Sequence, residues 1–488
     1  MDVEVLAEAI AAYAPQVLRV TAAPGISIAV GAGDEVVHAA AFGIADLATG
    51  RPMTTDTVGP TGSDAKPYTG VAALQLVDAG VLGLDDPVND HLDDLHLDNP
   101  MGERPITLRD LLTHRSGLGT TVGFCDLVPP APLGDHLRQV FERGRTDMYG
   151  GDLMPLWATP VGAHYQYSNT GIAVVGYLVE RANPDGVDFS EWVRRHVFEP
   201  LGMTSTCFPP VQDAAHVPAD LLARRSVGYA TLTGLAMSLP QIHVGDYPAG
   251  TALTTPTDHA RFLLAAAGLG RLGDARVLET STAREMLTPQ AARGMDPSAA
   301  TGLVWNLFDL GSELTYFGHG GELMWGWHHV ARAWPVPRIA VTASCNQFDL
   351  GDQGSSDRPS HLAGRLLLDV VTAWVRGEDP RPRCTEAAAR SALAGLIVGD
   401  RLSGRLGMQA PVSDEAIAAM AAATVVADGT PWDPAAFADA VRAHLATGGS
   451  LAEGAVVWRD RIIEHERDLR GRQLGVPGLP NLAATLGL

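Results

Sequence analysis

The sequence predicts an α/β fold in which an antiparallel sheet is flanked by helices, with a helical lobe inserted at about residues 70–260. The segment 24–47 has the pattern of two strands joined by a turn at Gly31–Asp34. Strand-like patterns return between 302 and 345, after a long stretch dominated by helical periodicity. An antiparallel sheet built from the strands on both sides of the helical stretch accounts for the order of the segments.

Individual elements follow from periodicity and from capping residues. A helix is expected at 70–79, ending at Gly80, and Thr257 is the expected N-cap of another helix. The segment 106–118 is expected to be a helix capped by Thr107 that runs into a Gly turn. Besides an amphipathic N-terminal helix, the remaining expected helices are 171–182, 188–198, 256–268 and 359–376. The expected later strands are 302–309, 314–317, 325–332 and 338–345.

The composition changes near the end of the predicted catalytic domain, residues 1–376. The segment 377–384, GEDPRPRC, is rich in proline and charge and is predicted to be a linker. Residues 385–488 are predicted to form an additional C-terminal helical module. Its Ala-rich helical segments are 385–397, 413–427, 434–446 and 451–470.

Charge and composition exclude several classes of function. The 488 residues carry a formal net charge of -21, which disfavours nucleic acid and anionic membrane surfaces as partners. No apolar run is long enough for a transmembrane helix, and the N-terminus has acids where a signal peptide is basic, so we expect a cytoplasmic protein. The four cysteines form no CxxC pair and are expected to be reduced, structural thiols: Cys125, Cys207, Cys345 and Cys384.

The chain contains one lysine, Lys66, and its other 34 basic residues are arginines. Lys66 follows Ser63 by three residues in TGSDAKPYTG, so on a helical turn the two side chains face the same side. Burial lowers the pKa of a lysine and makes it a base. A nearby helix N-terminus favours negative charge on the serine oxygen. Chance placement of a lysine after S-x-x is the alternative.

Two further motifs carry candidate site residues. Tyr167 and Asn169 flank Ser168 where a loop meets a helix, so the tyrosine could relay a proton and the amide could hold a carbonyl or the lysine. The simpler alternative is a capping pair beside a core tyrosine. His319 precedes Gly320 and Gly321 at the expected start of an edge strand, where glycines allow close approach of a substrate to the backbone. The alternative there is a hairpin turn with an ordinary histidine.

Together and in this order, the three motifs resemble the serine β-lactamase and D,D-peptidase superfamily, which also contains penicillin-binding proteins. Its motifs are S-x-x-K, [YS]-x-N and [KH]-[TSx]-G. Longer blocks over about residues 10–376, among them ITLRDLLTHRSGL and YSNTGIAVVGYLVE, are similar to class C β-lactamase-related serine hydrolases. The resemblance implies a β-lactamase/transpeptidase-like fold, with the active site between the sheet and the helical lobe.

The resemblance also implies roles for these residues. Ser63 matches the acylated nucleophile, Lys66 its base, Tyr167 the proton relay and Asn169 the ligand of the substrate amide. The backbone N–H groups of Ser63 and Glu322 match the two oxyanion donors.

Two positions depart from the β-lactamase pattern. His319 stands where β-lactamases carry lysine, as is usual among the esterases, peptidases and transacylases of the superfamily. The residue after the nucleophile is an acid, Asp64, which is uncommon.

Trp325 and Trp327 share one face of an expected strand, and Trp325 could stack on the substrate near His319.

The sequence therefore predicts an enzyme that transfers acyl groups through an acyl-Ser63 intermediate, acting on a small-molecule or peptidic ester or amide. A transacylase or a penicillin-binding-protein-type thioesterase that cyclises peptides is an alternative, and a catalytically silent binding protein is another.

No cofactor is expected. No metal site is expected either, because His328 and His329 point to opposite sides of a strand. The sequence gives no indication of the oligomeric state.

Overall fold

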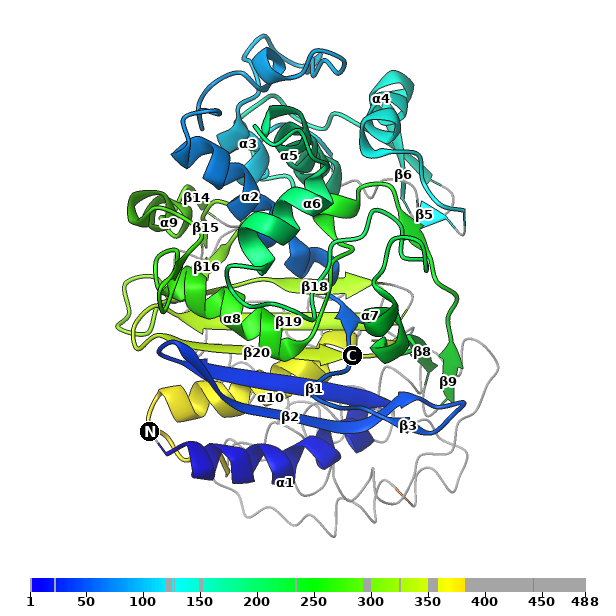
Figure 1. Ribbon diagram of the computed structural model, residues 1–488, viewed down its shortest axis with the longest axis vertical. Helices are drawn as coiled ribbons and strands as arrows, with labels where there is room; N and C mark the ends of the chain where they lie inside the picture. Colours follow the sequence, from blue (N-terminus) through cyan, green and yellow to red (C-terminus); the bar gives the residue numbers. More distant parts are fainter. Residues whose placement is uncertain are drawn as a thin grey trace.

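The computed structural model describes residues 2–381, except 22, 120–124, 127, 149–151, 233–234, 293–299, 324–325 and 350–358, together with residue 442 (Figure 1). The predicted linker is described only as far as residue 381. The predicted C-terminal module at 385–488 lies outside the described residues, apart from residue 442. Within the described part, no helix has the length and apolar character needed to cross a membrane.

The central sheet joins strands from both ends of the described region. Strand β1 (Gly25–Ala32) pairs antiparallel with β2 (Glu35–Asp46) on one side and with β20 (Ile339–Cys345) on the other, and β20 pairs with β19 (Trp327–Trp334). Beyond β19 the sheet continues through β17 (Tyr316–Gly318), β16 (Asn306–Phe308), β15 (Ala300–Thr301) and β14 (Ala291–Ala292), and beyond β2 lies β3 (Arg51–Pro52). A short strand, β18 (Gly320–Leu323), also pairs with β19. The sheet predicted from the two ends of the chain is confirmed.

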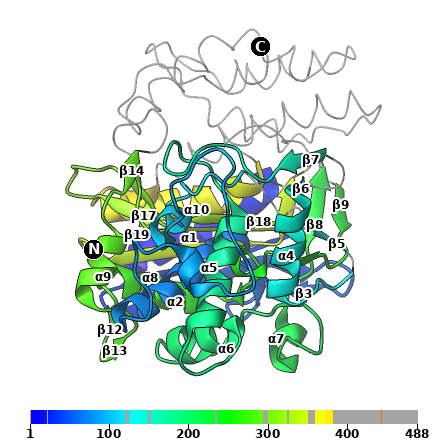
Figure 2. The ribbon, with the colours of Figure 1, turned by 90° about the horizontal axis from the view of Figure 1, so that it is seen from above.

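Helices cover both faces of the sheet. Helices α1 (Val3–Thr21) and α10 (Pro359–Val375) pack together on one face, and α8 (Pro256–Ala267) lies on the other (Figures 1 and 2). The alternate residues Ile26, Ile28 and Val30 of β1 belong to the core under α1 and α10, as the two-residue period of a strand requires. The larger core on the opposite face includes the helical lobe.

The helical lobe is built around α2 (Lys66–Asp78), whose residues 66–74 are all buried, because other elements surround it. The other α-helices on this side are α3 (Leu108–Leu112), α4 (Leu133–Arg143), α5 (Asn169–Ala182), α6 (Phe189–Val193), α7 (Ala219–Arg224) and α9 (Thr280–Met286). The short helical turns are η1 (Gly62–Ala65), η2 (Val88–His91), η3 (Arg194–Phe198) and η4 (Tyr247–Ala249). The small strands are β4 (Gly59–Pro60), β5 (Cys125–Asp126), β6 (Arg145–Met148), β7 (Asp152–Pro155), β8 (Tyr229–Leu232), β9 (Leu235–Ser238), β10 (His243–Val244), β11 (Leu253–Thr254), β12 (Arg271–Leu272), β13 (Ala275–Arg276) and β21 (Gln347–Asp349).

Three sequence-based expectations need correction. Helix α2 begins at Lys66 rather than at residue 70, because the 3₁₀ turn η1 leads directly into it. The N-cap of α8 is Thr255 rather than Thr257, since the Thr255 side chain accepts the N–H of Asp258. The segment 302–305 is not a strand: Val304 has φ 64° and donates its N–H to the Leu112 carbonyl of α3.

Two of the four cysteines have side chains in the described part. Cys207 and Cys345 are free thiols. Burial raises the pKa of Cys207 to about 12 and that of Cys345 even further, so both stay protonated and unreactive near neutral pH. The side chains of Cys125 and Cys384 lie outside the described part.

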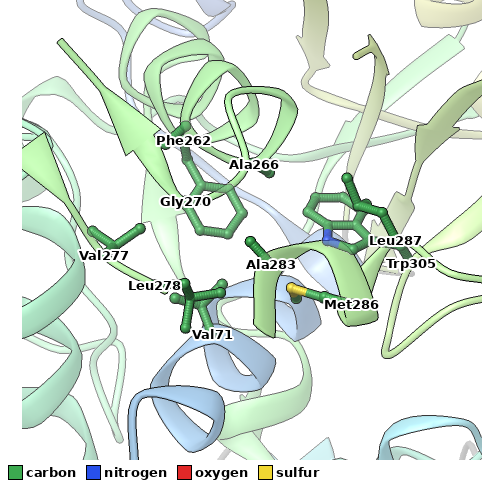
Figure 3. A pocket seen from close by; sticks show the side chains of 11 residues that line it. Val71, Phe262, Ala266, Gly270, Val277, Leu278, Ala283, Met286, Leu287 and Trp305 are labelled. Carbon is green, nitrogen blue, oxygen red and sulfur yellow. The ribbon is translucent and has the colours of Figure 1, made fainter. Parts of the chain in front are cut away.

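An apolar cavity lies between α2, α8 and α9 (Figure 3). Phe262, Met286 and Trp305 are among the side chains that line it, and it contains about 10 Å³, enough for one water molecule. Because none of the predicted site residues lines it, this cavity is a packing defect of the core and not the substrate site.

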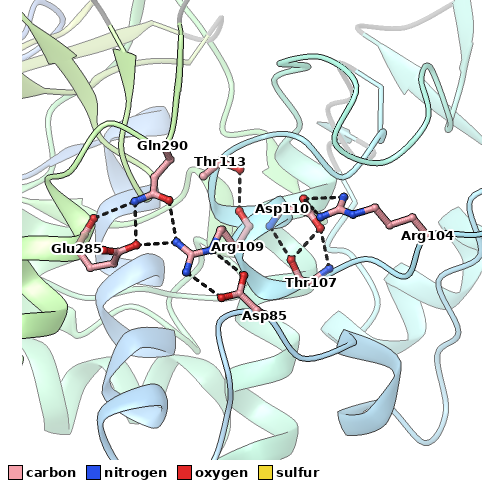
Figure 4. A network of polar contacts seen from close by, with 8 residues as sticks. All are labelled: Asp85, Arg104, Thr107, Arg109, Asp110, Thr113, Glu285 and Gln290. Carbon is pink, nitrogen blue, oxygen red and sulfur yellow. Dashed lines mark hydrogen bonds and ion pairs between the residues drawn. The ribbon is translucent and has the colours of Figure 1, made fainter.

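Polar contacts join α3 to the loop after α2 and to the end of α9 (Figure 4). Arg109 donates to Asp85 on one side and to Glu285 and Gln290 on the other. The helix itself begins with a capping box, in which Thr107 Oγ1 accepts the N–H of Asp110 and the Asp110 side chain accepts the N–H of Thr107.

Replacing Thr107 with alanine removes half of this capping box. We expect the Thr107→Ala variant to lose about 1 kcal/mol of unfolding free energy, because a buried backbone N–H loses its acceptor. Thermal unfolding monitored by circular dichroism measures the loss. Ser281→Ala, at an exposed position of α9, is the control, and an equal change in both variants would contradict the assignment.

Candidate active site

Ser63 lies on the 3₁₀ turn η1 that leads into α2. Gly62 has φ 55°, a conformation that favours glycine, and it places the chain against β18. Between Thr61 and Gly70 only Ser63 is partly exposed, whereas its neighbours are buried. The turn therefore presents one hydroxyl to the surroundings from an otherwise enclosed backbone.

Lys66 is fully buried and touches three oxygen atoms. Its Nζ lies 2.9 Å from Ser63 Oγ, one helical turn away. The other two distances are 2.7 Å to Asn169 Oδ1 and 2.8 Å to the Ala249 carbonyl oxygen. Both of these atoms only accept hydrogen bonds. A neutral amine that donates to both has its lone pair left for the hydroxyl proton of Ser63.

The environment favours this neutral amine. Burial lowers the pKa of Lys66 well below its usual value, whereas the carboxylates of Asp246 and Asp64 oppose the shift. The desolvation of the ammonium outweighs the attraction of the two carboxylates. Lys66 can therefore accept a proton at a pH where an exposed lysine cannot.

The N-terminus of α5 supplies the next two groups. Ser168 is the N-cap, with Oγ accepting the Gly171 N–H at 3.1 Å, so the predicted capping role is real. The cap fixes Asn169 beside Lys66, and the ring centroid of Tyr167 lies 4.8 Å from Lys66 Nζ. The ring of His114 packs 4.5 Å from that of Tyr167. Tyr167 and Asn169 thus both adjoin the lysine.

Asp246 precedes η4, the turn that supplies the Ala249 carbonyl. Its carboxylate lies 2.8 Å from His136 Nε2 and accepts the Thr170 hydroxyl at 2.8 Å. These contacts connect α4, α5 and η4 around Lys66. The side chain of Asp246 is fully buried within this network.

The backbone of β18 approaches the serine turn very closely. A Cβ added to Gly321 would lie 1.7 Å from the Thr61 carbonyl oxygen and 2.8 Å from the Ser63 nitrogen. A Cβ added to Gly62 would lie 2.5 Å from the Glu322 nitrogen. The two glycines therefore let the backbone nitrogens of Ser63 and Glu322 come near each other, as two donors for one oxyanion require.

His319 lies between β17 and β18, directly before the strand that approaches the serine turn. It is 8% exposed, and its Nδ1 donates to the Gly320 carbonyl at 2.7 Å. Trp325 lies outside the described residues, so its predicted stacking role stays a prediction. Trp327 is buried and donates to Ser226 Oγ at 2.9 Å, which makes it part of the core.

Sequence reasoning missed several neighbours of the site. Asp64 was noted as uncommon, but nothing linked it to His259 and His329, which contact it from α8 and β19. His114 and His136 were also missed. The only available signal was histidine in otherwise apolar segments, such as PTDHARFLL, and such a signal alone does not identify a partner.

A model of the family described as Beta-lactamase matches residues 11–365. The chain belongs to the β-lactamase family. The sheet, the helical lobe and the position of Ser63 at the start of α2 agree with this assignment, and the predicted β-lactamase/transpeptidase-like fold is confirmed.

Relatives in the family carry different names. Penicillin-binding protein 4 of Amycolatopsis lactamdurans is 29% identical over 61% of this chain and 74% of its own length. Esterase EstB of Burkholderia gladioli is 32% identical over 43% of this chain and 53% of its own length, so the match spans about half of that protein. These relatives indicate a general serine acyl hydrolase activity.

A solved structure shows the same fold. The octameric penicillin-binding protein homologue from Pyrococcus abyssi superimposes with a TM-score of 0.62 at 22% identity, covering 80% of this chain and 81% of that one.

Because the backbone approaches so closely at Gly321, we predict that alanine has very different effects at Gly321 and at its neighbour Gly320. Gly321→Ala forces β18 away from the serine turn, so we expect a lower unfolding temperature and about a 100-fold slower reaction of Ser63 with a fluorophosphonate probe. Gly320→Ala is the matched control, because its Cβ would meet nothing nearer than 3.6 Å. Similar labelling rates in the two variants, measured by intact-protein mass spectrometry, would contradict this account.

Proposed function

We propose that the protein is a serine acyl hydrolase or acyltransferase that forms an acyl-Ser63 intermediate on an ester or amide substrate. The observation that carries the proposal is the 2.9 Å contact between Ser63 Oγ and a fully buried Lys66 whose other two partners are acceptors only. This arrangement directs the lone pair of the amine at the serine proton.

The steps follow from the positions of the groups. Lys66 takes the proton of Ser63 as Oγ attacks the acyl carbon. The backbone N–H groups of Ser63 and Glu322 stabilise the oxyanion that forms on the acyl oxygen. Tyr167, next to Lys66, relays the proton that Lys66 took to the leaving group, which departs with the electron pair of its broken bond to the acyl carbon. An incoming water, amine or alcohol then gives up its proton by the reverse route and attacks the acyl carbon. The bond from that carbon to Ser63 Oγ breaks, and Oγ takes back a proton from Lys66.

His319 and Asn169 complete the proposed site. His319 stands at the start of β18, where an imidazole can contact the leaving group or the acceptor. The Asn169 oxygen is occupied by Lys66, and its amide nitrogen remains the group that could contact a substrate carbonyl. A penicillin-binding protein and an esterase among the relatives support an ester or amide substrate.

The proposal requires a covalent adduct on one serine. Incubation with a fluorophosphonate should add one phosphonyl group to the protein with loss of fluoride, and Ser63→Ala should remove the adduct, as intact-protein mass spectrometry can show. The absence of an adduct with any acylating probe would instead favour a silent binding protein. A screen of esters, D-amino-acid amides and peptidyl thioesters, with analysis of cyclic products, would then identify the substrate and the acceptor.

The role of Lys66 predicts the effect of a conservative substitution. Arginine keeps its proton at any accessible pH, so Lys66→Arg should lower the labelling rate about 10²- to 10⁴-fold. In the unchanged protein, the rate should rise with pH as Lys66 loses its proton. Because burial lowers this pKa, half-maximal rate should occur well below about pH 10.4, the value of an ordinary lysine. A near-normal rate in Lys66→Arg would refute the assignment.

A further inference from the structure

A second cluster of buried titratable groups lies directly behind the nucleophile. Asp64, between Ser63 and Lys66 on η1, meets His259 of α8 and His329 of β19. All three side chains are 0% exposed. The cluster therefore joins the serine turn to both the sheet and the helix that covers it.

The contacts define the protonation of the cluster. His329 Nδ1 lies 2.6 Å from Asp64 Oδ2 and must donate to it, because a carboxylate only accepts. Burial lowers the pKa of His329 in spite of Asp64, so the ring is neutral and its Nε2 accepts from the Thr342 hydroxyl at 3.2 Å. On the other side, His259 Nε2 is 3.3 Å from the same carboxylate oxygen, and its Nδ1 is 2.5 Å from the Tyr68 hydroxyl.

These contacts keep Asp64 negatively charged. Burial alone would raise its pKa, but the two histidines outweigh burial and hold the pKa far below the usual range. The charged groups that act on Lys66 are this carboxylate and that of Asp246, whose oxygens contact His136 of α4 and Thr170 of α5. Tyr167, whose ring centroid lies 4.8 Å from Lys66 Nζ, is a further titratable group against the amine.

We propose that Asp64 is a positioning residue for the reaction. His259 and His329 hold its side chain as a carboxylate. In this form Asp64 anchors the Ser63 turn and sets the pH range in which Lys66 acts as a base. This inference rests on the proposed acyl-Ser63 chemistry. Without the negative charge of Asp64, buried Lys66 would lose its proton at a lower pH than it does beside two carboxylates.

The same residue types can hold a transition metal, with Asp64, His259 and His329 as ligands. However, two ligand atoms at 2.0–2.1 Å from one tetrahedral ion lie about 3.3 Å apart. The 2.6 Å between His329 Nδ1 and Asp64 Oδ2 is a hydrogen-bond length and too short for that arrangement. The geometry therefore favours a hydrogen-bonded network over a metal site.

The test is the pH dependence of the fluorophosphonate labelling rate, followed by intact-protein mass spectrometry. Asp64→Asn removes the charge, and we expect the acid limb of the profile to move to lower pH by about 1 unit. Asp110→Asn is the matched control, since it removes a buried carboxylate that contacts Arg104 and Thr107 and should leave the limb unmoved. A purely structural role for Asp64 would change the rate without moving the limb.

A second pair of variants tests the histidine and covers the case in which Asp64→Asn fails to fold. His329→Gln keeps an N–H donor for Asp64 and should retain the wild-type profile, whereas His329→Leu should shift the limb toward that of Asp64→Asn. An unmoved acid limb in Asp64→Asn or His329→Leu overturns the inference. A stoichiometric metal ion in the unchanged protein that is lost in Asp64→Asn, measured by elemental analysis, also overturns it. Absence of any Ser63 adduct in the unchanged protein overturns the proposed function as well, whereas labelling with an unmoved limb overturns this inference alone.

Discussion

The proposed active site depends on the complete burial of one amine, that of Lys66. Lys66 has no contact with solvent, so its charged form is costly, and three oxygen atoms from three different parts of the chain define its position. The start of α2 supplies Ser63, the capped N-terminus of α5 supplies Asn169, and η4 supplies the Ala249 carbonyl. The packing of the helical lobe is therefore what lowers the pKa of the lysine that we propose as the base.

A second constraint acts on the backbone. Two glycines, Gly62 and Gly321, allow η1 and β18 to approach so closely that no side chain fits between them. This contact places two backbone nitrogens beside the serine, and it belongs to the interface between the sheet and the helical lobe. Because Asp64 lies on the same turn, its contacts with His259 and His329 stabilise the sheet side of that interface.

Much of the fold was predictable because its signals are local. The hairpin of β1 and β2, the helix ending at Gly80 and the Thr107 cap all follow from turn residues, caps and periodicity. The errors arose where tertiary contacts override local preference. Val304 adopts a positive φ, and its N–H bonds to α3 rather than to a strand. Helix α2 starts at Lys66 because a 3₁₀ turn continues into it, which periodicity does not reveal.

The sequence by itself determined that Ser63 and Lys66, the proposed nucleophile and base, lie side by side, because residues three apart on a helical turn face the same side. It also indicated Tyr167, Asn169 and the His-Gly-Gly motif at 319–321 through a family pattern. Only the tertiary structure decided that Asn169 holds the lysine, and that Asp64 meets two histidines almost 200 and more than 260 residues away. The physical reason is that a hydrogen bond or a charge acts over a few ångströms in space, and spacing along the chain determines such distances only within one helix or strand.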